Sequence, residues 1–128
     1  MWRATYTPQV SAAREVFVQE AELLLADDTD PAAPGAAVTV ALCGYWEHEG
    51  PCRWPHNNAI AAERGTTARF RTLFVADGAE EQAVRDLIVA ALAHATGWTV
   101  TSNAARPVAE SEHDLARRLL STRAADQL

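Results

Sequence analysis

Residues 67–102 read as one strand–helix–strand unit, and this unit limits the folds open to the chain. Between Asp77 and Gly97, apolar residues recur at the three- and four-residue spacing of one helix face. They are Val84, Leu87, Ile88, Ala91, Leu92 and Ala95. Asp77 is suited to the start of this helix and Gly97 to its stop. The flanking segments 67–76 and 98–102 are rich in β-forming residues, so both are predicted strands.

The first half of the chain predicts three further elements. Residues 2–6 alternate weakly between apolar and polar, as a short strand would. A helix is predicted from Thr7-Pro8 to Asp27, because Thr and Pro are favoured at a helix start. Its apolar stripe is Val10, Ala13, Phe17, Ala21 and Leu24. Residues 38–46 alternate again and predict a strand, and a last short helix is predicted over 111–120.

These elements run strand, helix, strand, strand, helix, strand, helix. Without the last helix the order is βαββαβ, which predicts an α+β fold of the ferredoxin-like (split βαβ) type. In that fold an antiparallel sheet carries its helices on one face, and here an extra C-terminal helix follows. The length suits a single domain over residues 1–128. Such sheets often have a face or edge covered by a partner subunit, so we expect a homodimer. Four residues are then expected near the covered or ligand-facing side, namely Thr39, Tyr45, Arg69 and Arg71.

Composition narrows the classes of partner and chemistry. The net charge is −6, so non-specific nucleic-acid binding is not expected. No apolar run reaches the roughly 18 residues that suggest a membrane span. Residues 1–6 do not resemble a secretory signal, so we expect a cytoplasmic protein with reduced cysteines. The chain contains no lysine, which excludes lysine Schiff-base catalysis.

Residues 43–58 concentrate unusual side chains and form the candidate site. They hold both cysteines, two of the four tryptophans and two of the four histidines. Imidazole and thiolate are preferred zinc ligands, so His48, Cys52 and His56 are predicted metal ligands on a long loop over 47–58. A three-ligand zinc site leaves one position for water, and Glu47 or Glu49 could then act as catalytic base. Whether Cys43 joins as a fourth ligand stays open.

Two other chemistries are open for the same loop. Trp46 and Trp54 offer flat apolar walls, while Arg53 and Asn57 offer polar contacts, a mixture typical of a pocket for a small molecule or an anion. Alternatively, Cys52 could be a nucleophile with a loop histidine as base and Arg53 lowering its thiol pKa. Against all of these stands a structural role, in which the tryptophans and histidines simply pack the loop.

Two classes of function follow. One is a small metal- or ligand-dependent enzyme, with zinc as its possible cofactor. The other is a non-catalytic, dimeric binding or interaction module, whose Trp/His loop is structural or holds an anion or small molecule. The position of the loop histidines in the folded chain distinguishes them.

Overall fold

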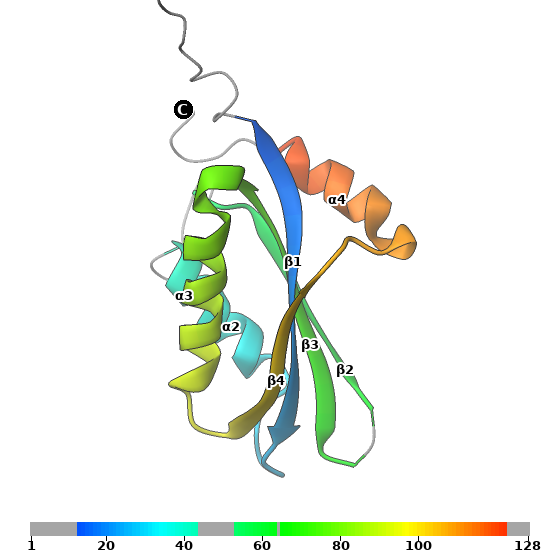
Figure 1. Cartoon of the computed structure of the whole chain (residues 1–128). Helices are drawn as coiled ribbons and strands as arrows, with labels where there is room; N and C mark the ends of the chain where they lie inside the picture. Colours follow the sequence, from blue (N-terminus) through cyan, green and yellow to red (C-terminus); the bar gives the residue numbers. More distant parts are fainter. Residues whose placement is uncertain (1–12, 44–52, 64, 123–128) are drawn as a thin grey trace, which may run out of the picture.

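The computed structural model describes residues 13–43, 53–63 and 65–122 (Figure 1). Its four strands form one antiparallel sheet in the order β2-β3-β1-β4. In chain order the elements are β1 (Arg14–Leu25), α2 (Ala33–Cys43), β2 (His56–Ala62), β3 (Thr67–Asp77), α3 (Glu81–Ala93), β4 (Trp98–Arg106) and α4 (His113–Leu120). The short 3₁₀ turns η2 (Gly78–Glu80) and η3 (Glu110–Glu112) precede α3 and α4. The prediction of an α+β fold is confirmed.

Helices lie on both faces of this sheet. α2 and α3 pack together over one face, whereas α4 lies on the opposite face against β1 and β3 (Figure 1). The main core fills the space between the sheet and the α2–α3 layer. Its largest buried members are Leu23, Phe70, Phe74, Ile88 and Leu92. None of the described helices has the length and apolar character that a membrane crossing requires.

The strand β1 occupies residues that the sequence predicted as helix, so that prediction is wrong over residues 14–25. Phe17 and Ala21 reach the α2–α3 core, and their spacing of four fits a helix as well as a strand. Val18 is also fully buried, although alternation directs it to the opposite face. A central strand that is buried on both faces has apolar residues on both, so its sequence does not alternate between apolar and polar residues. Pairing with β3 and β4 determines the conformation of β1. The predicted strand over residues 2–6 lies outside the described residues.

The helix α2 occupies part of the segment predicted as a strand over 38–46, which is the second error. Asp30 starts the helix, because its carbonyl and side-chain oxygens accept hydrogen bonds from the Ala33 and Ala32 amides, both at 2.9 Å. Pro34 is tolerated in the first turn. Pro34, Val38 and Leu42 are buried at four-residue intervals. The alternating apolar residues at 38, 40 and 42 therefore mimicked a strand.

The edge strand β2 begins inside the predicted site loop. His56 and Asn57 are its first residues, so only the segment before them connects α2 to β2. The strand pairs with β3 in a regular register from His56 opposite Phe74 to Ala62 opposite Ala68. Side chains of neighbouring residues in this segment therefore point to opposite faces of the sheet.

The second half of the chain follows its prediction closely. β3 and α3 lie within one or two residues of the expected strand and within a turn of the expected helix. Asp77 accepts a hydrogen bond from the Ala79 amide at 3.0 Å and so caps the turn that leads into α3. β4 extends beyond its predicted end to Arg106, and α4 falls inside 111–120.

Candidate functional site

The structure divides the predicted site residues into two groups. Arg53, Trp54, His56 and Asn57 are described, and their contacts follow. Five others lie outside the described residues: Trp46, Glu47, His48, Glu49 and Cys52. Of the three predicted zinc ligands, His48, Cys52 and His56, the described residues include His56.

Both ring nitrogens of His56 have protein partners. Nδ1 lies 3.0 Å from the Trp54 carbonyl oxygen, and Nε2 lies 3.0 Å from Thr39 Oγ1. A carbonyl only accepts, so Nδ1 carries the proton and Nε2 of a neutral ring accepts from the Thr39 hydroxyl. The Nε2 lone pair that a metal would use is therefore occupied by Thr39. In this arrangement His56 ties β2 to α2.

The aromatic wall predicted for a pocket is also engaged. Trp54 Nε1 donates to Glu80 Oε1 at 3.3 Å, and Arg53 Nη2 donates to Glu80 Oε2 at 2.5 Å. The Arg53 guanidinium lies 4.9 Å from the Trp54 ring centroid, within cation–π range. The hydrogen bond from Arg53 is the main cause that lowers the Glu80 pKa. Glu80 thus joins Arg53 and Trp54 to the turn before α3. The sequence indicated only a helix start in this turn.

Asn57 belongs to the opposite face of the sheet. Its backbone carbonyl and its Oδ1 both accept from Arg71 Nη1, each at 2.9 Å. Arg71 Nε donates in turn to Glu112 Oε2 at 2.9 Å. Asn57 is therefore not brought together with His56, and no site of the described residues contains both.

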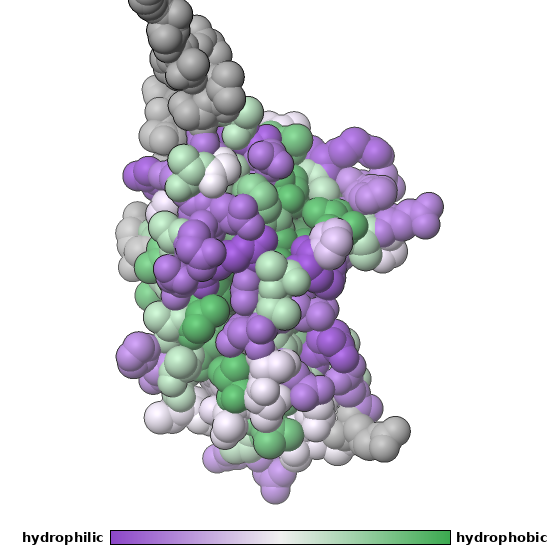
Figure 2. Space-filling view, viewed as in Figure 1, coloured by the Kyte–Doolittle hydropathy of each residue, from purple (hydrophilic) through white to green (hydrophobic). Residues whose placement is uncertain are grey.

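A network of ion pairs holds the second face of the sheet beneath α4. Glu112 accepts from both Arg71 and Arg106, and Glu20 accepts from Arg69 and Arg106, at 2.9–3.2 Å. The hydrogen bond from Arg106 is the main cause that lowers the Glu112 pKa to about 2. Figure 2 shows that the surface below α4 is largely hydrophilic. Arg69 and Arg71, which were expected near the covered or ligand-facing side, pair with Glu20, Glu63 and Glu112.

A third cluster joins α2 to β2 and was missed by sequence reasoning. Asn58 Nδ2 donates to the Gly35 carbonyl at 3.1 Å and to Thr39 Oγ1 at 3.3 Å. Thr72 Oγ1, fully buried in β3, donates to Asn58 Oδ1 at 2.7 Å. A Cβ added at Gly35 would lie 3.3 Å from Asn58 Cβ, so glycine permits this close approach. The one available signal was Thr39, the only polar side chain of α2.

Metal-binding groups are not gathered in the described residues. Within 13–43, 53–63 and 65–122, no three His, Cys, Asp or Glu side chains are placed to hold an ion together. Cys43 is disulfide-bonded, so its sulfur is not a thiolate that could bind zinc. The expectation of reduced cysteines is therefore not met at Cys43.

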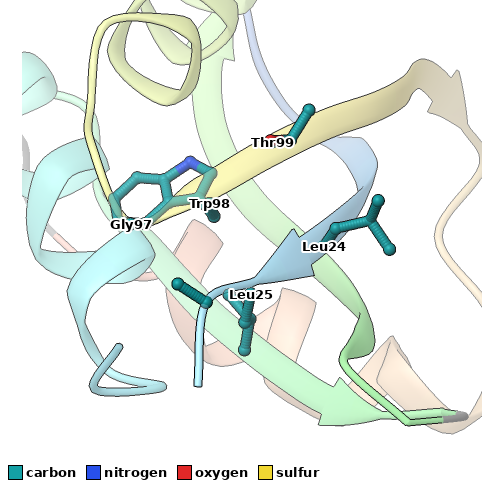
Figure 3. Close-up of a pocket in the computed structure, with 6 residues that line it drawn as sticks. Leu24, Leu25, Gly97, Trp98 and Thr99 are labelled. Carbon is teal, nitrogen blue, oxygen red and sulfur yellow. The ribbon is translucent and has the colours of Figure 1, made fainter. Parts of the chain in front are cut away.

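A shallow hollow of about 380 Å³ lies where β1 ends and β4 begins. Figure 3 shows Leu24, Leu25 and Trp98 around it. Trp98 Nε1 donates to the Leu92 carbonyl at 3.0 Å, so the indole N–H is satisfied inside the protein. No charged side chain lines the hollow, and nothing in its chemistry selects a ligand.

The chain matches no protein-family model, and neither curated proteins nor solved structures give a significant match. Function therefore rests on the geometry of this chain.

Proposed function

We propose that the protein is a non-catalytic interaction module that works as a homodimer, built on a ferredoxin-like fold. The βαββαβ order of β1 to β4, together with the antiparallel sheet order β2-β3-β1-β4, supports this fold type. The homodimer was expected from the sequence on general grounds. A specific surface now supports it.

The observation that carries the proposal is an uncharged flank formed by α2 (Ala33–Cys43) and β2 (His56–Ala62). Neither element contains Asp, Glu, Lys or Arg, although 22% of the chain is charged. A helix that is apolar on all sides is normally buried on all sides. In α2, however, Val40 is 43% exposed and Ala36 is also exposed. This flank is therefore suited to contact with another protein surface.

The charged residues on the sheet face beneath α4 favour the flank, rather than that face, as the dimer interface. The arginines beneath α4 are paired with Glu20, Glu63 and Glu112. On the face seen in Figure 2, α4 and the region below it are mainly hydrophilic. Protein interfaces have cores depleted of charged residues, and the flank has this composition.

The alternative of a zinc enzyme acting through His48, Cys52 and His56 requires a change at His56. Its Nε2 would have to give up the Thr39 hydroxyl, and its Nδ1–H donates to the Trp54 carbonyl. The engaged state of Arg53 and Trp54 also favours a structural role for this part of the loop. These contacts support the interaction module over the enzyme.

Sedimentation equilibrium of the full chain tests the homodimer. The wild type is expected to have twice the mass of one chain at micromolar concentration. Val40→Glu should shift it toward the monomer, because a buried carboxylate without a partner is costly. Leu120→Glu is the matched control, since Leu120 is 41% exposed and lies on α4 across the sheet. A monomeric wild type, or equal effects of both variants, would contradict the proposal.

A further inference from the structure

We infer that two copies of the chain join through their β2 strands, paired antiparallel about a two-fold axis at Ala59. The inference rests on the proposed homodimer and specifies its interface. It would join two four-stranded sheets into one continuous sheet. The occupant of the β2 edge is thus a second copy of this chain.

The hydrogen bonds to β3 define which backbone groups of β2 face outward. The Glu63 amide donates to the Thr67 carbonyl, and the Val75 amide donates to the Pro55 carbonyl, both at 2.9 Å. In an antiparallel pair the residues alternate between hydrogen-bonded and non-hydrogen-bonded positions. Odd-numbered residues of β2 therefore bond to β3. The backbone groups of Asn58, Ile60 and Ala62 are directed away from it.

The β2 edge lacks the features that normally prevent strand addition. Its register with β3 is unbroken over seven residues, and it contains no charge and no proline. Exposed edges are usually protected by charges, proline or bulges. The other edge strand, β4, has such protection, because its pairing with β1 shifts between Glu22 and Leu23 and it ends at the ion-paired Arg106. Among the described residues, no strand lies beyond β2.

Self-pairing also suits the side chains. A two-fold at Ala59 overlaps the whole of β2 and places Asn58 opposite Ile60 of the partner subunit, with both backbones facing the junction. Ala59 meets Ala59 of the partner subunit at a non-hydrogen-bonded position, where Cα atoms approach to about 4.5 Å and small side chains fit best. The chain has a net charge of −6, so an uncharged junction avoids placing like charges together.

The strand is held in place before any partner arrives. Asn58 binds Gly35 and Thr39 on α2 and accepts from Thr72 on β3. His56 contacts Thr39 as well. A rigid edge loses little conformational freedom on association, which favours binding. The uncharged α2 would accompany β2 to the interface and contribute apolar contact.

Charges of opposite sign introduced at Ala59 test this register. Ala59→Glu and Ala59→Lys each place like charges opposite one another in a homodimer, so each alone should weaken dimerisation about tenfold or more. An equimolar mixture should restore dimers containing one chain of each kind. Sedimentation velocity measures both effects, and circular dichroism checks that each variant is folded.

A second pair of variants covers failure of the charged variants to fold. Ala62→Pro removes an outward N–H without touching the ladder to β3, whereas Ala62→Thr keeps that N–H. We expect a weaker dimer only for Ala62→Pro. A dimeric wild type that both charge variants leave at its original affinity would overturn the β2 interface and leave the homodimer standing. If each charge variant alone dimerises weakly and an equimolar mixture of the two does not restore the dimer, the two-fold axis at Ala59 is overturned. A wild type that stays monomeric would overturn the homodimer itself.

Discussion

Thr72 Oγ1 donates a 2.7 Å hydrogen bond to Asn58 Oδ1, and this bond joins the buried centre of β3 to the edge strand β2. Thr72 is fully buried, so the bond is shielded from water. Asn58 Nδ2 in turn donates hydrogen bonds to Gly35 and Thr39 of α2. Side-chain hydrogen bonds therefore connect both elements of the uncharged flank, α2 and β2, to the centre of the sheet.

Thr72→Val keeps the shape of the side chain but leaves Asn58 Oδ1 without its donor. We expect the free energy of unfolding to fall by about 1–3 kcal/mol, the cost of an unsatisfied buried polar group. Urea unfolding followed by circular dichroism measures the change. Thr72→Ser retains the hydroxyl and should lose less. An equal loss in both variants would indicate packing rather than the hydrogen bond.

Acid should weaken the attachment of α4. The Glu112 pKa is about 2 in the folded chain, mainly because Arg106 donates to it. A carboxyl whose folded pKa lies below its unfolded value stabilises the fold above the unfolded pKa and loses that effect as pH falls toward the folded pKa. We expect a loss of about 1–3 kcal/mol between roughly pH 4.5 and pH 2.

Glu112→Gln provides the comparison for this pH dependence. Its free energy of unfolding should already be lower at neutral pH and should fall less steeply between pH 4.5 and pH 2. Chemical unfolding at several pH values measures both. A variant with the wild-type slope over this range would show that Glu112 is not the titrating group.

Arg85 is a buried cation whose loss should be costly. Its Nη1 donates to the Val18 carbonyl and to Gln19 Oε1, both at 2.8 Å, and its guanidinium also binds Glu81. Arg85→Met would leave buried acceptors unsatisfied, with an expected loss of about 3–5 kcal/mol. Arg118→Met, on an exposed position of α4, should change stability by less than about 0.5 kcal/mol. Thermal or urea unfolding of both variants compares them, and similar small effects would contradict this role.

Zinc tests the structural role of His56. Because Thr39 occupies Nε2 and Trp54 accepts from Nδ1, added zinc should leave the melting temperature of the wild type unchanged. His56→Ala should lower the free energy of unfolding by about 1–3 kcal/mol through loss of both bonds. Stoichiometric zinc in the purified protein, lost in His56→Ala, would instead support the metal site.

The sequence predicted elements correctly where local and tertiary signals agree. The stripe of Val84, Ile88 and Leu92 in α3 indicates burial directly, since these residues recur at four-residue intervals and all three are buried. The predictions for the segments that form β1 and α2 were wrong, each for a different reason. Val18 and Leu23 are buried on a strand covered on both faces, which hides the alternation. α2 is apolar on nearly all sides, so its burial pattern could not be recognised as helical.

The candidate site could be predicted only as a collection of residue types. His56 and Asn57 are neighbours in sequence, yet β2 directs one toward α2 and the other toward Arg71. They are separated because both belong to the strand β2. The prolines just before β2 favoured a loop in the prediction. The partner of Arg53 and Trp54 is Glu80, which lies 26 residues beyond Trp54. Such a contact is made by the fold and leaves no local pattern in the sequence.

Amide hydrogen exchange at single-residue resolution tests the β2 interface most directly. The amides of Ala59 and Ala61 bond to β3, so their exchange should not depend on protein concentration. The amides of Asn58 and Ile60 face the junction and should be protected at high concentration, then exchange faster on dilution into monomers. Alternating protection along β2 that disappears on dilution is the predicted result. Exchange of Asn58 and Ile60 that is equally fast in a dimeric and a diluted sample would contradict the interface.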